Sequence, residues 1–333
     1  MNGTAVTEPR RLGKGGPEIS AIGLGCMSLS GVYGKSDDAA GVALIHRAIE
    51  LGVDHFDSSD MYGWGQGEEL LGRALKGRRD QVLIASKFGQ TQRPGGANGV
   101  DGTPAYIAQA CEASLKRLGV DVIDLYYQHR VDPAVPVEDT VGAMARLVEQ
   151  GKVRFLGLCE ARPERIRRAH AAHPIAAVQS EFSLLYRQEA TETRELTRDL
   201  GITFLAYAPL GRGLLTGDIP DFDNLAQGDT RGRHPRFMGD NFAKNRALVE
   251  HIEAIAREKE CTPAQLVLAW LLAQGPDVIP IPGTKRVARL EENLGALDVR
   301  LSAGDIGRIS AAIPIGAAAG TRYPEGGMRG VYI

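Results

Sequence analysis

The sequence predicts an α/β fold, a (β/α)8 barrel, and two observations lead to it. Short runs rich in apolar and β-branched residues alternate along the chain with amphipathic runs of helical length. Eight such strand and helix pairs can be counted, and eight is the number that closes a barrel of parallel strands. Because barrels of this kind commonly exceed about 250 residues, residues 1–333 are assigned to a single barrel domain.

The predicted strands are mostly apolar and show no clean alternation with polar residues, as expected for parallel strands that helices cover. They span residues 20–25, 54–58, 81–87, 122–129, 153–158, 176–179, 202–207 and 278–281. The predicted helices span residues 39–51, 68–75, 103–118, 137–149, 163–171, 189–200, 263–273 and 286–296.

Several segments fall outside this repeat. Residues 11–18 contain three glycines and a proline, which predicts an N-terminal β-hairpin that caps the barrel floor. Two accessory helices are expected at 245–259 and 303–312. Residues 217–241 are rich in Asp, Gly, Arg and Pro and follow the seventh strand, where active-site loops of barrels belong, so they are expected to form a lid.

Composition limits the classes of partner. The formal net charge of −2 is too small to gather nucleic acid or anionic lipid. The polar N-terminus lacks a signal-peptide core, and the apolar stretch 266–273 is too short to span a bilayer, so a cytoplasmic protein is expected. Four cysteines without a CxxC pair predict reduced thiols and no metal site, and oligomeric state leaves no clear mark.

Four polar residues are expected to meet at one rim of the barrel. Asp57, Lys87 and His129 end the second, third and fourth predicted strands, and Tyr62 lies in the loop after the second. Active sites of barrels lie at this carboxyl-terminal face. A carbonyl that accepts a hydride needs a proton donor, and Tyr62 can serve if Lys87 lowers the pKa of its phenol. Asp57 would hold the Lys87 ammonium, and His129 would orient the substrate oxygen.

In three segments the chain resembles the aldo-keto reductase family. They are residues 56–63, 86–88 and 124–130, which contain the four polar residues, and the resemblance extends over about residues 10–300. It implies an NADP-dependent oxidoreductase that reduces aldehydes or ketones to alcohols. NADPH would lie extended across the barrel mouth, without metal or flavin.

The resemblance also implies which residues bind NADPH. Gln179 would contact the nicotinamide amide and Tyr207 its ring, while Arg289 would bind the 2′-phosphate. The full implied set is Gly25, Met27, Asp57, Cys159, Glu160, Gln179, Tyr207, Pro209, Leu210, Gly211, Arg212, Gly213, Gly283, Thr284, Lys285, Arg289, Glu292 and Asn293. Gly283 stands where many members carry a lysine, and Lys285 is expected to replace it. The basic residues near a helix start favour NADPH over NADH.

Two other functions remain open at this point. Lys87 could form a Schiff base in a lyase or an aldolase, since barrels host that chemistry as well. Alternatively, the chain could be a regulatory subunit that senses redox state through bound NADPH with little turnover, as in the channel-associated branch of the family.

Overall fold

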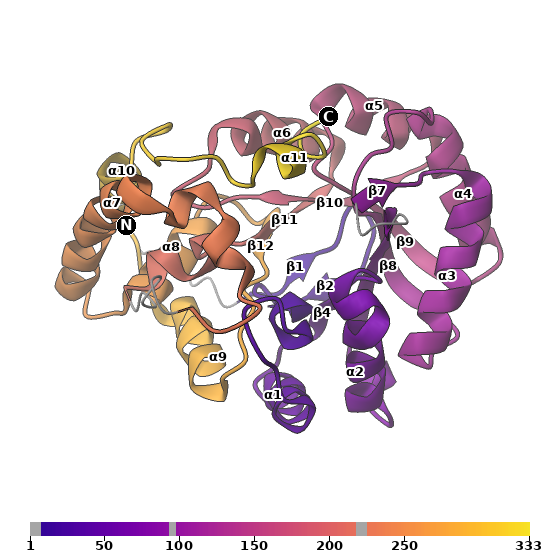
Figure 1. Ribbon diagram of the computed structural model, residues 1–333, viewed down its shortest axis with the longest axis horizontal. Coiled ribbons are helices and arrows are strands. Elements are labelled where there is room, and N and C mark those ends of the chain that lie inside the picture. The colour runs from indigo at the N-terminus through magenta and orange to yellow at the C-terminus, as the bar shows by residue number, and fades with distance from the viewer. Residues whose placement is uncertain (1–7, 93–97, 218–224) are drawn as a thin grey trace.

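The computed structural model describes residues 8–92, 98–217 and 225–333, and their helices surround a central sheet (Figure 1). Within these residues, parallel strands form an eight-stranded sheet in the order β12-β11-β10-β9-β8-β5-β4-β3. The strands are β3 (Leu24–Gly25), β4 (His55–Asp57), β5 (Leu83–Phe88), β8 (Ile123–Gln128), β9 (Val153–Cys159), β10 (Ile175–Glu181), β11 (Thr203–Tyr207) and β12 (Val278–Pro280).

Backbone hydrogen bonds join the two edges of this sheet. The Gly23 amide donates to the Pro280 carbonyl over 3.0 Å, and the Gly25 amide donates to the Pro282 carbonyl over 3.2 Å. A Cβ atom on Gly25 would lie 2.8 Å from the Ile281 carbonyl oxygen, so this close approach requires glycine. The sheet therefore closes on itself, and the predicted barrel is confirmed.

The N-terminal hairpin is present and lies at the barrel floor. Strand β1 (Arg10–Arg11) pairs antiparallel with β2 (Glu18–Ile19). The Gly13 amide donates to the Thr203 hydroxyl over 2.7 Å, and that hydroxyl donates to the Arg11 carbonyl over 2.8 Å. Thr203 is the first residue of β11, so these bonds fix the hairpin to the amino-terminal end of the strands.

Helices follow the strands in the predicted alternation. They are α1 (Asp38–Glu50), α2 (Gln66–Leu75), α3 (Pro104–Leu118), α4 (Val137–Glu149), α5 (Pro163–Ala172), α6 (Gln188–Leu200), α7 (Gly239–Glu258), α8 (Pro263–Leu272), α9 (Val287–Leu294), α10 (Ala303–Ala312) and the short α11 (Glu325–Met328). The accessory helix α10 begins and ends as predicted. The sequence did not predict α11.

Helix α7 begins at Gly239, six residues before the predicted start at 245. Gly239, Asp240 and Asn241 favour turns, which is why the sequence placed them in the lid. In the structure Asp240 lies in the first turn, where a negative charge is stabilised by the helix dipole. The Asn245 amide donates to the carbonyls of Arg236 and Ala319 over 3.0 and 2.9 Å, which fixes this end of the helix.

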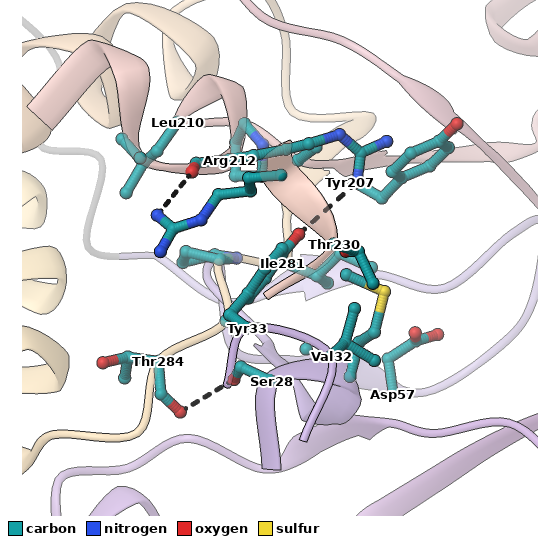
Figure 2. Close-up of a pocket in the computed structure, with 18 of the residues that line it drawn as sticks. Ser28, Val32, Tyr33, Asp57, Tyr207, Leu210, Arg212, Thr230, Ile281 and Thr284 are labelled. Atoms are coloured by element: carbon teal, nitrogen blue, oxygen red, sulfur yellow. Dashed lines mark hydrogen bonds between the residues drawn. The ribbon is translucent and has the colours of Figure 1, made fainter. Parts of the chain in front are cut away.

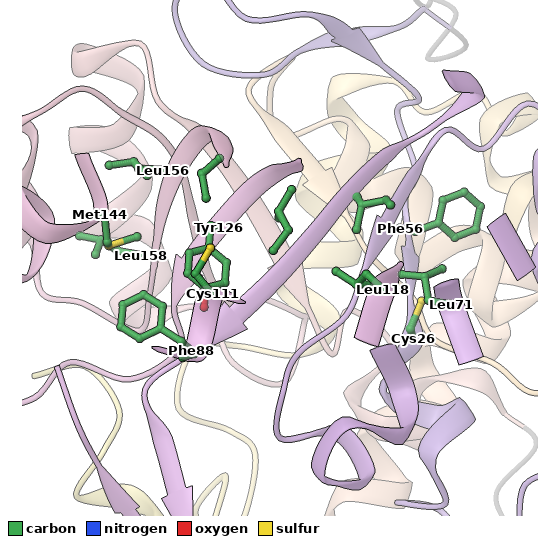
Figure 3. Packing of buried hydrophobic residues seen from close by; sticks show 14 of the residues in the cluster. Cys26, Phe56, Leu71, Phe88, Cys111, Leu118, Tyr126, Met144, Leu156 and Leu158 are labelled. Atoms are coloured by element: carbon green, nitrogen blue, oxygen red, sulfur yellow. The ribbon is translucent and has the colours of Figure 1, made fainter. Parts of the chain in front are cut away.

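Each strand alternates between two apolar environments. Leu83 and Leu125 face the barrel interior, whereas Ile84 and Tyr126 face the surrounding helices. Figure 3 shows Tyr126 in this outer layer beside Phe88, whose ring centroid lies 5.1 Å away. Because both faces are buried, the strands carry apolar residues without polar alternation.

Two segments near the barrel mouth contain short elements of regular structure. Residues 90–103 contain a small antiparallel hairpin of β6 (Gln90–Gln92) and β7 (Asn98–Val100). Of the predicted lid, residues 218–224 lie outside the described residues. The remainder includes two short 3-10 helices, Thr230–Arg233 and Pro235–Phe237, before α7 begins. In the described part of the chain, no helix has the length and apolar character needed to cross a membrane.

Candidate active site

The structure brings the four predicted catalytic residues together at the carboxyl-terminal end of three neighbouring strands. Asp57 ends β4, Lys87 is the penultimate residue of β5, and His129 directly follows β8. Tyr62 begins a 3-10 helix, Tyr62–Gly65, in the loop after β4. Adjacent parallel strands present these ends side by side, which explains why residues distant in sequence converge.

Lys87 is at the centre of this group and is fully buried. Its ammonium forms an ion pair with Asp57, donates to the Ser58 carbonyl over 2.7 Å, and lies 3.4 Å from the Tyr62 hydroxyl. Burial tends to lower the pKa of Lys87, but Asp57 and Tyr62 outweigh this effect and raise it above the ordinary value. The ammonium therefore stays charged beside the phenol.

The Tyr62 phenol differs from the sequence-based expectation in its pKa. Burial raises this pKa above the ordinary value of about 10, and Lys87 opposes the rise without reversing it. Lys87 therefore lowers the pKa of Tyr62 as predicted, but the net pKa is not below the ordinary value, because burial has the larger effect. The phenol keeps its proton at neutral pH, and Lys87 stabilises the phenolate that would form when the proton leaves.

His129 also lies close to the Tyr62 ring. Its ring centroid is 6.0 Å from that of Tyr62, in an edge-to-face arrangement, and its Nδ1 atom is 3.0 Å from the Ser59 hydroxyl. Burial, followed by the charges of Arg130 and Lys87, lowers the pKa of His129 well below the ordinary range. The imidazole is therefore neutral at physiological pH and can hydrogen-bond a substrate oxygen without bringing a charge.

A cavity of about 760 Å³ opens over this group, in the range typical of small-molecule sites. Figure 2 shows Asp57 and Tyr207 on one side of the view and Thr284, hydrogen-bonded to Ser28, on the other. Most residues of the predicted catalytic and cofactor sets line it: Gly25, Met27, Asp57, Tyr62, His129, Gln179, Tyr207, Pro209, Leu210, Arg212, Gly213, Gly283, Thr284, Arg289, Glu292 and Asn293. The structure does not bring Lys87, Cys159, Glu160, Gly211 or Lys285 to its surface.

Glu160 takes part in a buried ion pair instead of facing the cavity. Arg322 lies in the C-terminal segment, residues 313–333, which follows α10. It donates to both carboxylate oxygens of Glu160 over 2.8 and 2.9 Å. The Tyr207 hydroxyl and the Glu181 amide donate to one of these oxygens over 2.8 and 2.9 Å. Burial raises and Arg322 lowers the pKa of Glu160, and the net pKa lies below its ordinary value. Glu160 thus links the C-terminal segment to Tyr207.

The preceding residue, Cys159, ends β9 and is also buried. Burial raises the pKa of its thiol to about 12, so the thiol is protonated at neutral pH. Gln179, by contrast, lines the cavity, and its amide donates to Asp57 over 2.8 Å.

Lys285 likewise does not line the cavity and binds backbone carbonyls instead. Its ammonium donates to the backbone carbonyls of Tyr33, Gly34 and Lys35 over 2.8, 3.4 and 3.2 Å. It therefore fixes the loop after β3, and its expected role as a phosphate ligand stays a prediction.

Several arginines line the cavity. Arg286 directly precedes α9, and Arg289 lies in the first turn of that helix, where it forms an ion pair with Glu292. Arg212 lies in the loop after β11, and its guanidinium carbon is 4.9 Å from the Tyr323 ring centroid. Positive side chains at the start of a helix favour phosphate groups.

Sequence reasoning missed several residues that line the cavity. They come from the loop after β3, the hairpin β6–β7, the loop after β8, the predicted lid and the C-terminal segment: Ser28, Val32, Tyr33, Gln90, Arg130, Thr230, Arg231, Arg233, His234, Tyr323, Pro324 and Gly327. Tyr323 is positioned through a contact of 3.1 Å between its hydroxyl and that of Tyr207. For Arg130, the sequence feature that could have indicated a place in the cavity was its position directly after His129.

Comparison with known proteins identifies the family. The sequence pattern of the Aldo/keto reductase family matches residues 21–314. The chain belongs to this family. A probable aldo-keto reductase from Glycine max is 47% identical over 324 residues, which cover 97% of this chain and 93% of the relative. The NADP(+) aldo-keto reductase yakc of Schizosaccharomyces pombe is 46% identical over 318 residues, with 94% of each chain covered.

Solved structures of this family have the same fold. A glycerol dehydrogenase from Gluconobacter oxydans superimposes with a TM-score of 0.82 at 28% identity and covers 93% of this chain and 95% of its own. An aldo-keto reductase from Klebsiella pneumoniae in complex with NADPH gives a TM-score of 0.74 at 25% identity, with coverages of 95% and 99%.

Proposed function

We propose that the protein is an NADPH-dependent reductase that converts aldehyde or ketone carbonyls to alcohols. The observation that carries this proposal is the buried Tyr62 phenol, 3.4 Å from an ammonium that Asp57 holds, at the base of a large cavity. Family membership supports small-molecule carbonyl compounds as substrates. The S. pombe relative, named for NADP(+), and the NADPH-bound structure from K. pneumoniae support the choice of cofactor.

The residues that line the cavity fit a dinucleotide with three phosphate groups. Arg212 is proposed to bind the pyrophosphate, and Arg286 and Arg289, at the start of α9, are proposed to bind the 2′-phosphate. Gln179 and Tyr207 are proposed to offer an amide and an aromatic ring to the nicotinamide.

When bound there, NADPH supplies the hydride that adds to the carbonyl carbon. Tyr62 donates its proton to the carbonyl oxygen, which becomes the alcohol oxygen. Lys87 stabilises the resulting phenolate, and Asp57 keeps the Lys87 ammonium in place. His129, held neutral by its environment, hydrogen-bonds the same oxygen and orients it.

The Schiff-base alternative is disfavoured by the surroundings of Lys87. A lysine that attacks a carbonyl needs a lowered pKa and access to the substrate. The pKa of Lys87 is raised, its ammonium is ion-paired, and it does not reach the cavity surface.

The predicted lid and the β6–β7 hairpin are proposed to shape the substrate pocket. Thr230, Arg233 and Gln90, which belong to these segments, line the cavity. We expect that exchanging either segment alters substrate preference more than NADPH affinity.

Unpaired thiols at all four cysteines agree with the proposed cytoplasmic location.

The test is a fluorescence titration with NADPH and NADH, followed by loss of NADPH absorbance with a panel of aldehydes and ketones. Tyr62→Phe should bind NADPH as the wild type does and lose turnover by about 100- to 10,000-fold. Undiminished turnover in that variant would exclude Tyr62 as the proton donor. Tight NADPH binding by the wild type without turnover would favour the regulatory function, and no binding would exclude the proposed cofactor site.

A further inference from the structure

Arg130 is a cationic side chain that the proposed reaction does not use. It directly follows His129, lines the cavity and is partly exposed to it. Its guanidinium donates to the backbone carbonyl of His129 over 2.7 Å. Its aliphatic stem lies against Gly330 of the C-terminal segment, since a Cβ atom on that glycine would be 3.7 Å from the Arg130 Cδ atom.

Within the described part of the chain, Arg130 forms no ion pair with a carboxylate. Glu160, an acidic group close enough to influence Arg130, is fully engaged by Arg322. Two other arginines that line the cavity do have carboxylate partners: Arg212 pairs with Glu181 over 3.7 Å, and Arg231 pairs with Asp229 over 2.6 Å. A cation withdrawn from water is stabilised by an anionic partner, and here the cavity is where such a partner can come from.

The position of Arg130 separates it from Arg286 and Arg289, which are proposed to bind the 2′-phosphate of the cofactor. Arg286 and Arg289 follow β12, whereas Arg130 follows β8 beside the catalytic histidine. Arg212 is nearer, since it stacks on Tyr323, whose charge also influences Arg130. In the sheet order, β9, β10 and β11 lie between β8 and β12. An anion bound at Arg130 would therefore belong to the molecule whose carbonyl lies between Tyr62 and His129.

We propose that Arg130 binds an anionic group of the substrate, and that the preferred substrates are aldehydes or ketones that carry a carboxylate or a phosphate. This proposal rests on the proposed reductase function. The planar guanidinium offers two parallel N–H donors, which match the oxygens of a carboxylate or a phosphate.

The test compares matched substrates: 3- and 4-carboxybenzaldehyde, their neutral methyl esters, and the corresponding formylphenyl phosphates. In the wild type, kcat/KM should be at least about 10-fold higher for an anionic member than for its ester. A preference for carboxylate over phosphate, or the reverse, identifies the source of the anion. A wild type that reduces the esters as well as the anions would overturn the proposal while leaving the reductase function intact.

Variants then assign the preference to Arg130. Arg130→Met should lower kcat/KM for the preferred anion by about 10- to 100-fold and leave the ester within about 3-fold of the wild type. Arg130→Lys, which keeps the charge but not the planar fork, should give an intermediate loss. Arg167→Met removes one exposed charge from α5 and should leave the preference unchanged. An equal loss on ester and anion in both Arg130 variants would contradict a role in anion binding.

Binding of benzoate to the protein with NADP+, measured by calorimetry, provides a readout that does not need turnover. Arg130→Met should weaken this binding by about the same factor as it lowers kcat/KM for the carboxylate. If no aldehyde were reduced but benzoate binding still depended on Arg130, the reductase function would fail and the anion site would stand. Binding unchanged in both Arg130 variants would exclude the anion site.

Discussion

The buried pair of Lys87 and Asp57 shows how one interaction can serve both stability and chemistry. Both side chains are withdrawn from solvent, 0% and 2% exposed, so each needs the charge of the other. The sequence could place these two residues at neighbouring strand ends. It could not give the pKa of Tyr62, because the burial that raises this pKa depends on packing from several elements.

We expect that replacing Lys87 separates the two roles. Lys87→Met should lower kcat by at least about 100-fold, since the phenolate of Tyr62 loses its stabilising charge. It should also lower the free energy of unfolding by about 3–5 kcal/mol, because Asp57 stays buried with its charge unpaired. The double variant Lys87→Met/Asp57→Asn should recover much of this stability in urea unfolding but not the activity. Recovery of activity in the double variant would contradict the assigned role of Lys87.

The cysteines give a second prediction at the residue scale. Cys26 and Cys159 are buried, and burial raises the pKa of each thiol to about 12. Because the thiolate is the reactive form, both should resist iodoacetamide at pH 8 in the folded protein. Cys261 is partly exposed and should be modified first, as mass spectrometry of digested protein would show. Equal labelling of all four thiols is expected only in urea, and fast native labelling of Cys159 would contradict its burial.

At the scale of elements, the alternating strands and helices could be read from the sequence, whereas the C-terminal segment could not. Strands and helices are specified by local patterns of apolar residues. The segment after α10 is positioned by single contacts such as Arg322 with Glu160, which are 162 residues apart. A local sequence pattern cannot predict a contact between residues so far apart. The sequence therefore did not indicate that Tyr323, the residue after Arg322, lines the cavity.

The ion pair of Arg322 and Glu160 is therefore expected to attach this segment to the barrel. Arg322→Met should lower the free energy of unfolding by about 3–5 kcal/mol, because Glu160 is left buried and unpaired. The double variant Arg322→Met/Glu160→Gln should lose less than the sum of the two single variants, as urea unfolding of all four proteins would measure. Strict additivity would show that the pair does not act as a unit.

At the scale of the whole molecule, buried histidines should make stability depend on pH. Neither ring nitrogen of His55 has a hydrogen-bond partner among the described residues, and burial lowers its pKa. Above the ordinary pKa of about 6.5, His55 is neutral in both the folded and the unfolded protein. Below this pH, His55 takes up a proton in the unfolded chain but stays neutral in the folded protein. Stability should therefore fall as the pH decreases below about 6.5, by up to about 1.4 kcal/mol per pH unit for each such histidine, until the folded pKa is reached.

His55→Asn tests this dependence. Urea unfolding at pH 7.5 and 5.5 should show a smaller loss of stability between the two pH values than the wild type shows. His251→Asn replaces an exposed histidine on α7 and should leave the loss unchanged. If His55→Asn lost as much stability between pH 7.5 and 5.5 as the wild type does, other groups would produce the pH dependence.

The hydrogen bonds from Gly23 and Gly25 to Pro280 and Pro282 also matter while the protein is being made. The two sides of this seam are separated by 257 residues. At typical translation rates of 5–20 residues per second, the ribosome needs about 13–50 s to synthesise the second side after the first. During that time the nascent sheet has an open edge at β3, which is only two residues long. So short an edge offers few backbone groups for pairing with other nascent chains, which should limit aggregation before the barrel closes.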